Sequence, residues 1–278
     1  MASILETSVD KSKHIISEAD SLIIAAGAGM GVDSGLPDFR GKDGFWQAYP
    51  ALRKSNLDFY QMANPTTFEQ RPDLAWGFYG HRLQMYRNIN PHAGFKKLLN
   101  LGRQKPNGYF VFTSNVDGHF QKAGFNEENV YECHGSIHYL QCSNQCNRQI
   151  WPANSFLPEI DIDRCQLINQ IPTCNQCNST ARPNILLFSD YGWLSNRSDS
   201  QQRRLENWLN QTSKPAIIEI GAGTAVPTVR RFSETIANHF NTKMIRINKE
   251  SASLNATNVI HLQASTIDAI HLLTNCRH

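Results

Sequence analysis

The sequence predicts an α/β fold built on a doubly wound parallel sheet, with a second, smaller domain inserted into it. Short apolar runs that suit buried parallel strands recur along the chain, and stretches with helical periodicity lie between several of them. The expected strands cover residues 21–26, 109–113, 129–133, 184–188, 216–220, 243–247 and 258–262. The expected helices cover residues 10–20, 93–101, 200–212, 227–240 and 265–274. This alternation predicts right-handed crossovers, with helices on both faces of the sheet.

Two stretches interrupt the alternation. Residues 42–91 are rich in aromatic side chains and are expected to be helical, whereas residues 138–182 are polar and carry paired cysteines. The second stretch has too few large apolar side chains for a core of its own. We therefore expect both to form one small domain, with the large domain made of residues 1–41, 92–137 and 183–278.

The bulk composition is that of an ordinary globular protein. The 278 residues are 40% hydrophobic and 18% charged. The net charge of +3 is small for this length and the basic residues are scattered, so no nucleic-acid partner is predicted. No run of about 18 apolar residues and no secretory signal is present, so we expect a cytoplasmic protein without a membrane span. The composition carries no signal for the oligomeric state.

Four of the seven cysteines form two close pairs. Cys142 and Cys146 enclose three residues, and Cys174 and Cys177 enclose two. Four thiolates so spaced are typical of a tetrahedral, structural Zn2+, because a closed site has no open position for a catalytic water. Unrelated free thiols are the alternative, and a redox dithiol is disfavoured because two pairs are present. The cysteines without a partner at ligand spacing are expected to be core or surface thiols: Cys133, Cys165 and Cys276.

Polar residues follow several expected strands at the carboxyl edge of the sheet, where ligands of such folds bind. The 109–113 strand leads into Asn115 and Asp117, and the 129–133 strand leads into His134-Gly135. His134 is the best general-base candidate, because imidazole takes up a proton near neutral pH and the adjacent glycine leaves room for a substrate. A structural histidine is the alternative. The small-residue turn Gly221-Ala222-Gly223 follows a further strand.

The 21–26 strand leads into a loop that matches a dinucleotide fingerprint only in part. Gly27 and Gly29 fit the Gly-x-Gly-x-x-Gly pattern, but Val32 stands in place of the third glycine. The stretch continues into Pro37-Asp38-Phe39-Arg40-Gly41, which cannot be helical because proline lacks the amide hydrogen. The loop is therefore expected to be long and irregular.

Together these segments resemble the sirtuins, the NAD-dependent protein lysine deacylases, over about residues 10–275. The matching pieces occur in family order: Gly27-Ala28-Gly29 with residues 34–41, residues 113–117, His134-Gly135, the cysteine pairs, Arg182-Pro183, the Gly221 turn and Ile247-Asn248. The resemblance implies an inverted Rossmann-like large domain, which explains the poor match to the ordinary fingerprint. It also implies acyl-lysine proteins or peptides as substrates, NAD as co-substrate and structural zinc.

The resemblance further implies which residues contact NAD. The pyrophosphate and adjoining ribose would be held by Gly27, Ala28 and Gly29, the mobile cofactor loop would contain Asp38, Phe39 and Arg40, the nicotinamide segment would comprise Ser114, Asn115, Val116 and Asp117, and the adenosine half would contact Gly221, Gly223, Asn248 and Ala264.

The implied reaction uses the acyl oxygen as a weak nucleophile, so the enzyme must stretch the nicotinamide–ribose bond and align that oxygen on the sugar carbon. His134 would then deprotonate a ribose hydroxyl, giving free lysine, nicotinamide and O-acyl-ADP-ribose. Mono-ADP-ribosyl transfer or NAD hydrolysis on the same scaffold is the second enzymatic hypothesis. A non-enzymatic NAD-sensing or zinc-stabilised module is disfavoured because His134, Asn115 and Asp117 are all present.

Tyr79 and Arg82 stand at i and i+3, which places both side chains on one face of an expected helix. A surface arginine beside a packing tyrosine is one interpretation. The stretch also resembles the Tyr-x-x-Arg motif of sirtuins that remove succinyl and malonyl groups, and a bidentate guanidinium suits a carboxylate at the end of an acyl chain. Desuccinylase or demalonylase activity is therefore expected as an option alongside deacetylase activity.

Four positions depart from the family pattern. Met30-Gly31 stands in place of Ile-Ser, Ser114 in place of Gln, and Ala222-Gly223 in place of Thr-Ser. We expect these three to bear on NAD binding. Ser189-Asp190 stands in place of Gly-Glu, and we expect it to affect how a peptide pairs in the groove.

Overall fold

The structure is a computed structural model that describes residues 2–37, 42–249 and 258–275. The expected loop residues Asp38, Phe39 and Arg40, together with Cys276, lie outside the described residues. Among the described helices, none combines the length and the apolar character that a membrane crossing requires.

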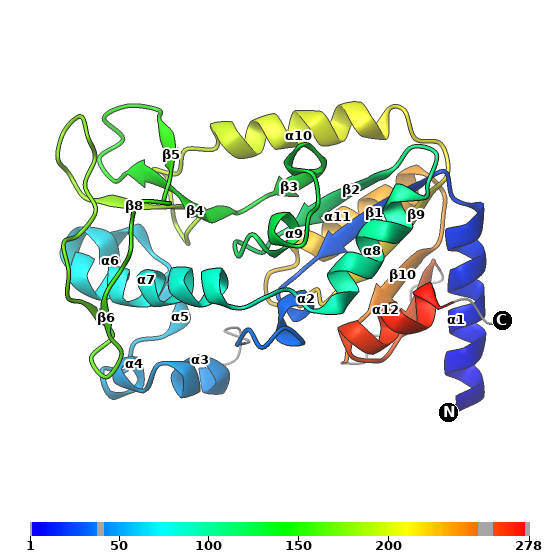
Figure 1. Cartoon of the computed structure of the whole chain (residues 1–278), viewed down its shortest axis with the longest axis horizontal. Helices are drawn as coiled ribbons and strands as arrows, with labels where there is room; N and C mark the ends of the chain where they lie inside the picture. The colour runs from blue at the N-terminus through cyan, green and yellow to red at the C-terminus, as the bar shows by residue number, and fades with distance from the viewer. Residues whose placement is uncertain (1, 38–41, 250–257, 276–278) are drawn as a thin grey trace.

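Within the described residues, a six-stranded parallel sheet forms the larger part of the molecule (Figure 1). Its strands, in spatial order, are β11 (Val259–Leu262), β10 (Met244–Ile247), β9 (Pro215–Ile220), β1 (Ser21–Ala26), β2 (Tyr109–Thr113) and β3 (Val130–Glu132). In the centre, Ile24 pairs with Val111 on one side and Ile218 on the other. Every residue of β1, β2 and β9 is buried, as expected for parallel strands covered on both faces.

Helices cover both faces of this sheet. One face packs against α1 (Ala2–Glu18), α8 (Ala93–Arg103), α9 (His119–Lys122) and α12 (Thr266–Thr274), with Ile16 and Phe95 in contact with the core around Ile24. The opposite face packs against α10 (Asn196–Leu209) and α11 (Thr228–His239), whose Leu205 and Val229 join Phe112. The expected doubly wound α/β architecture is therefore confirmed.

The smaller part, at the left of Figure 1, combines helices with short antiparallel strands. The helices are α3 (Lys42–Ala48), α4 (Pro50–Lys54), α5 (Phe59–Met62), α6 (Pro65–Gln70) and α7 (Pro72–Asn88). The strands are β4 (Gly135–Cys142), β5 (Ile150–Pro152), β6 (Ile160–Asp161), β7 (Gln166–Leu167) and β8 (Ala181–Ile185). They share one apolar core, in which Phe68, Trp76 and Phe78 pack with Ile137 and Leu140.

One expected strand of the parallel sheet is wrong. Residues 184–188 were expected in that sheet, but β8 ends at Ile185 and pairs antiparallel with β4, where Ala181 lies opposite Cys142. These strands form a separate three-stranded sheet in the order β5–β4–β8. An apolar run indicates burial, but it does not reveal which neighbour the strand pairs with.

Candidate active site

A cavity of 290 Å³ lies where the loops after the central strands face the smaller part of the molecule. The segment after β1 was expected to be irregular throughout, but it contains the short helix α2 (Gly29–Val32), and Ala28 directly before this helix lines the cavity. The helix α7 contributes Tyr79, Arg82 and Tyr86. The remaining predicted residues that line it are Ser114, Asn115, Val116, Asp117 and His134. Leu186, Leu187 and Phe188 form a further wall. The fold thus brings together at one cavity the two sheet-edge segments and the Tyr-x-x-Arg pair that lie far apart in the sequence.

The glycine turns after β1 and β9 meet backbone to backbone. The Gly29 amide donates to the Gly221 carbonyl at 3.0 Å, and the Gly27 amide donates to the Ile220 carbonyl at 2.9 Å. A Cβ atom on Gly29 would lie only 2.6 Å from the Gly221 Cα, and Gly221 itself has a φ of 59°. Glycine is therefore required at both positions of this contact. Because no side chain projects from either turn, a phosphate can approach the backbone at this edge of the sheet.

The segment after β2 is fixed by its own side chains. The Asn115 side-chain amide donates to the Gly27 carbonyl at 3.0 Å, which links this segment to the glycine loop after β1. The Asp117 carboxylate accepts from the His119 amide at 2.9 Å and is 8% exposed. Burial raises the pKa of Asp117, although the His119 amide, His138 and Arg82 oppose the shift. Asn115 thus fixes the segment after β2 against the glycine loop after β1, and the buried Asp117 carboxylate provides a hydrogen-bond acceptor at the cavity.

His134 lies at the end of β3, where β4 begins. Its carbonyl accepts from the Leu186 amide at 3.0 Å, and its half-buried side chain lines the cavity. Gly135 has a φ of 76°, and a Cβ atom there would lie 2.1 Å from the Asn184 carbonyl oxygen. Only glycine allows β8 to pass so closely beside the histidine. The backbone at His134 is therefore fixed against β8 and the residue that follows it, and the imidazole lines the cavity from this position.

Arg82 is a buried cation in this cavity, surrounded by aromatic rings. Its Nε and Nη2 donate to the Tyr86 hydroxyl at 3.1 and 2.8 Å, and its guanidinium carbon lies 5.5 Å from the ring centroid of Tyr79. Burial pulls the pKa of Arg82 down, but Tyr86, Tyr79 and Tyr49 outweigh it and raise that pKa. Burial also raises the pKa of Tyr79 to about 12, so the phenol stays neutral beside the cation.

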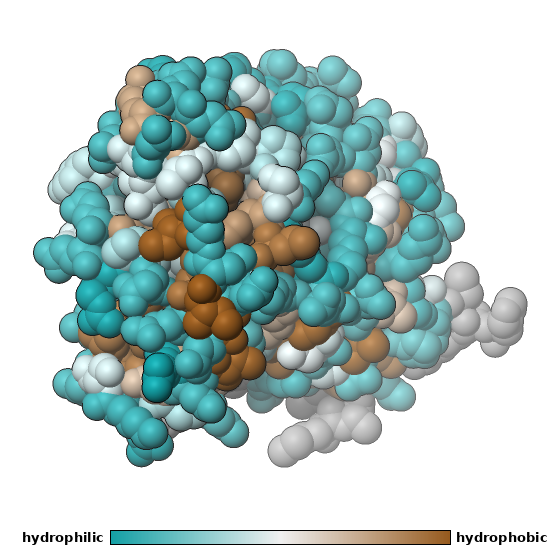
Figure 2. Space-filling view, turned by 60° about the vertical axis from the view of Figure 1, so that its left-hand side comes forward, coloured by the Kyte–Doolittle hydropathy of each residue, from teal (hydrophilic) through white to brown (hydrophobic). Residues whose placement is uncertain are grey.

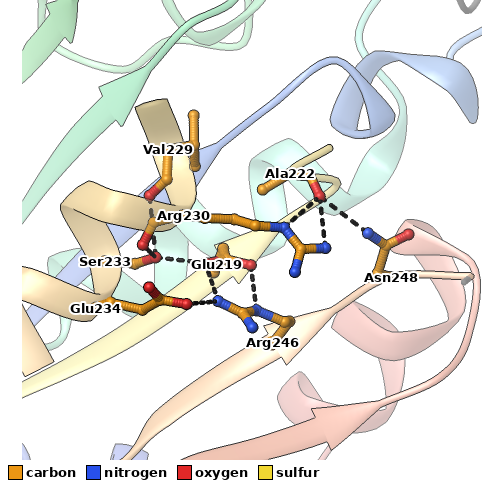
Figure 3. Close-up of polar contacts among 8 residues, drawn as sticks. All are labelled: Glu219, Ala222, Val229, Arg230, Ser233, Glu234, Arg246 and Asn248. Atoms are coloured by element: carbon orange, nitrogen blue, oxygen red, sulfur yellow. Dashed lines mark hydrogen bonds and ion pairs between the residues drawn. The ribbon is translucent and has the colours of Figure 1, made fainter. Parts of the chain in front are cut away.

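The turn after β9 is closed by side chains from two neighbouring elements (Figure 3). The Ala222 carbonyl accepts from Asn248 Nδ2 at 3.1 Å and from Arg230 Nε and Nη2 at 3.3 and 3.1 Å. Below the turn, Arg246 on β10 donates to Glu219 and Glu234 and ties β9 to α11. Asn248 was predicted from the sequence, whereas Arg230 was not.

The Sir2 family model matches residues 27–207, well over half of the chain. The chain belongs to the Sir2 family. The matched range includes the glycine loop after β1, the Asn115–Asp117 segment, His134 and all four paired cysteines.

Several curated proteins are similar to this Sir2 chain. NAD-dependent protein deacylase 1 of Archaeoglobus fulgidus is 32% identical over 184 residues, which cover 65% of each chain. The NAD-dependent protein deacylase of Aquifex aeolicus is 31% identical over 61% of this chain and 62% of its own length. The mitochondrial deacylase sirtuin-5 of Xenopus tropicalis is 29% identical over 64% of this chain and 59% of its own length. The chain thus spans slightly less than two thirds of these relatives.

Solved structures resemble the Sir2 chain over nearly all of its length. A mutant Sir2 homologue in complex with ADP-ribose has a TM-score of 0.70 and 25% identity, covering 95% of this chain and 94% of its own. A Sir2 homologue in complex with NAD has a TM-score of 0.72 at 24% identity, which shows a shared fold.

The four paired cysteines of this Sir2 chain converge. The sulfur atoms of Cys142, Cys146, Cys174 and Cys177 all lie within 4.8 Å of one another. The Asn147 side chain donates to the Cys146 sulfur at 3.2 Å, as expected beside a thiolate ligand. The donor set and its closed arrangement fit a structural Zn2+. Cys133 and Cys165 lie outside the cluster, and burial raises the pKa of each to about 12.

Proposed function

We propose that this protein is an NAD-dependent protein lysine deacylase. The observation that carries the proposal is the single cavity at which His134, Asn115 and Asp117 meet α7. The names of the relatives and their identities to this chain support the same activity. The known complex of a 25% identical homologue with ADP-ribose supports a nucleotide at the glycine turns.

We assign NAD to the carboxyl edge of the sheet. Its pyrophosphate would be held by Gly27, Ala28 and Gly29, its nicotinamide end by Ser114 to Asp117, and its adenosine half by Gly221, Gly223, Asn248 and Ala264. The close approach of Gly29 to Gly221 supports this assignment because it leaves backbone, not side chains, at the edge. Bound NAD supplies the ribose carbon and hydroxyls that receive the acyl group.

The chain's own residues would position and deprotonate the reactants. Asp117 can accept the carboxamide N–H groups, and its burial strengthens such a hydrogen bond. His134 can take the proton of a ribose hydroxyl, because its imidazole lines the same cavity. The aromatic and aliphatic wall of Phe59, Leu187 and Phe188 excludes water around an acyl-lysine side chain. The overall reaction consumes acyl-lysine, NAD and water, and yields lysine, nicotinamide and O-acyl-ADP-ribose.

We further propose that the cavity accepts acyl chains ending in a carboxylate, such as succinyl and malonyl. Arg82 places a permanent positive charge inside the cavity beside the neutral Tyr79 hydroxyl. A buried guanidinium gains most from a partner with negative charge, and the acyl carboxylate offers it two oxygens. Acetyl-lysine would fill the same cavity without using that charge.

We also propose that the division into a large domain and a small domain follows the boundaries expected from the sequence. The separate apolar cores of the two parts support it. A cytoplasmic location is proposed as well, since thiolates that bind a metal persist in a reducing compartment.

The decisive experiment is mass spectrometry of acetyl-, succinyl- and malonyl-lysine peptides incubated with the protein and NAD. Free lysine together with acyl-ADP-ribose is the expected result. A His134→Ala variant should lose this activity while it still binds NAD. Release of nicotinamide and ADP-ribose with every peptide untouched would contradict the proposal, and would instead identify an NAD hydrolase or ADP-ribosyltransferase.

A further inference from the structure

A second cavity, of 340 Å³, lies beside the 290 Å³ cavity that contains His134 and Arg82, which we call the acyl cavity after its proposed function. The second cavity belongs to none of the sites described above. Its walls come from the start of α6, from the loop between Cys142 and Cys146, and from the segment after β8. The residues that line it are Asn64, Pro65, Thr66, Glu69, Ser143, Gln145, Arg182, Ser189, Asp190, Tyr191 and Gly192. Nearly all of them are polar, in contrast to the apolar wall of the acyl cavity.

The two cavities follow one another along the same two chain segments. Ala63 lines the acyl cavity, and the residues directly after it line the second cavity. In the same way, Leu186 to Phe188 line the acyl cavity and Ser189 to Gly192 line the second. The Phe188 amide donates to the Ala63 carbonyl at 2.9 Å and ties the segments together between the cavities. A ligand that follows these segments therefore passes from one cavity to the other.

The charge that remains available in the second cavity is negative. Asp190 is engaged, because its carboxylate accepts from Arg182 at 2.8 Å and from the amides of Gly192 and Leu187 at 3.0 and 3.3 Å. Arg182 in turn is used by this pair and by the Ile185 carbonyl. Glu69, by contrast, has no ionic partner among the described residues and is exposed at the wall. The cavity thus keeps one unneutralised carboxylate.

Two further residues that line this cavity have side-chain groups without a hydrogen bond or ion pair among the described residues, Ser143 and Tyr191. The Ser143 hydroxyl oxygen is buried and makes no hydrogen bond within the described part of the chain. The Tyr191 side chain is 99% exposed, although it follows directly after the buried Asp190 carboxylate. A buried hydroxyl can accept from an N–H donor, and an exposed ring can stack on a guanidinium. Carboxylate, hydroxyl and ring together match an arginine side chain.

We propose that the second cavity binds a basic side chain of the substrate, preferably arginine, two or three residues away from the acyl-lysine. This inference rests on the proposed deacylase function. Consecutive residues line the two cavities, Phe188 and Ser189 on one segment and Ala63 and Asn64 on the other, so an extended peptide, which rises about 3.3 Å per residue, reaches from one cavity to the next within about three residues. Pockets for particular side chains of a bound peptide give selectivity.

The test is a peptide series with one acyl-lysine and a single arginine, alanine or glutamate placed at each of the three positions on either side. kcat/KM is measured with the full-length protein and saturating NAD. Arginine at one position, two or three residues from the acyl-lysine, should raise kcat/KM by about threefold to tenfold over alanine, which is the scale of a partly exposed ion pair with hydrogen bonds. Glutamate there should lower it.

Variants identify the cavity as the source of this preference. Glu69→Lys should reduce the arginine-to-alanine ratio to about one or invert it, and Tyr191→Ala should reduce it in part. Glu127→Lys makes the same change of charge at an exposed position on the short 3-10 helix Glu127–Asn129, outside both cavities, and should keep the ratio.

The outcomes separate the two proposals. If the peptides are deacylated with the same kcat/KM whether the flanking residue is arginine, alanine or glutamate, the second cavity does not bind a basic side chain, while the deacylase function stands. The same holds if Glu127→Lys abolishes the preference as fully as Glu69→Lys does. If no peptide is deacylated, the proposed function itself fails and the subsite falls with it.

Discussion

Arg82 is the residue on which the proposed preference for acyl chains with a carboxylate depends. Replacing it with methionine keeps the volume of the side chain but removes the charge, so an acyl carboxylate loses its hydrogen bonds. We expect kcat/KM for a succinyl peptide to fall by about tenfold to a hundredfold, because hydrogen bonds to charged groups contribute about 1.5–3 kcal/mol. Activity on an acetyl peptide should change little. Steady-state kinetics on both peptides measures the difference.

The control for this prediction is Arg71→Met, which removes an exposed arginine at the start of the same helix. This variant should leave kcat/KM unchanged for both the acetyl and the succinyl peptide. Equal losses on acetyl and succinyl peptides in Arg82→Met would contradict a role in acyl recognition and would point to Arg82 as a packing residue of α7.

Tyr86 shows what sequence analysis missed at this scale. Tyr79 and Arg82 were found through the family motif, but the hydroxyl that orients the guanidinium lies one turn further on. The i, i+4 spacing from Arg82 was a usable signal, because residues so spaced are neighbours on a helix. The sequence alone could not show that this face is buried, since tyrosine and arginine also occur together on exposed helices.

His119 predicts a pH dependence of stability. Burial, followed by the nearby charges of Lys122, His138 and His92, lowers its pKa to about 4. In the unfolded chain His119 has a pKa near 6.5, so between pH 6.5 and pH 4 the unfolded chain binds a proton at this residue and the folded protein does not. This contribution to stability is complete above pH 6.5 and is lost as the pH falls from 6.5 to 4. It amounts to about 3 kcal/mol of unfolding free energy.

Urea denaturation of the native protein and of His119→Phe at several pH values checks this. Phenylalanine retains the contacts with the rings of Tyr86 and Phe95 but cannot be protonated. The difference in unfolding free energy between the two proteins should change by about 3 kcal/mol between pH 7 and pH 4. A difference independent of pH would show that His119 does not carry the effect.

At the scale of elements, the strands of the parallel sheet could be predicted and the pairing of β8 could not. β1 and β2 are almost wholly apolar, and in β9 only Glu219 interrupts the apolar run, a pattern typical of a sheet covered on both faces. The run before Phe188 has the same appearance. Ile185 and Leu187 of that run are buried for a different reason, because they pack into the core formed with α7, whereas Leu186 is exposed. In this core Trp76 donates to the Ala181 carbonyl at 2.9 Å. Long-range pairing of this kind leaves no local mark in the sequence.

The contact between the turns after β1 and β9 predicts a difference between two glycines. Gly221 and Gly108 both have positive φ, but a Cβ atom on Gly221 would lie 2.5 Å from Gly29, whereas one on Gly108 meets nothing within 4 Å. Gly108→Ala should cost only the backbone strain of about 1–2 kcal/mol. Gly221→Ala should cost about 1–3 kcal/mol more, because the turns must separate.

Chemical denaturation of both variants measures the loss of unfolding free energy, and calorimetric titration with ADP-ribose measures the affinity of the proposed nucleotide site. We expect Gly221→Ala to weaken ADP-ribose binding and Gly108→Ala to leave it unchanged. If the two variants are equally stable and bind alike, the close approach of the turns is not required for the nucleotide site.

At the scale of the molecule, the candidate site lies between two cores. One core fills the parallel sheet and its helices, and the other joins α7 to the strands around the cysteine cluster. Val116 and Leu187 belong to the second core and also line the cavity proposed to hold the acyl group. The sequence indicated both parts through the change from apolar strands to aromatic helices and paired cysteines. It could not indicate how they meet, because the contacts between them join residues far apart in the chain.

This arrangement predicts what removal of zinc does. Residues 138–182 contribute short strands that are held by the four cysteines and by the second core, so chelation should loosen that core and leave the parallel sheet folded. Hydrogen exchange followed by mass spectrometry should show faster exchange in β4, β8 and α7, while β1 and β9 stay protected.

Cys174→Ser should reproduce this pattern and lower the zinc content. Cys165→Ser alters a buried thiol of the same core outside the cluster and should retain the metal. Uniform loss of protection would mean that the two cores unfold as one unit, and unchanged protection in α7 would mean that the cysteine cluster stabilises only its own loops.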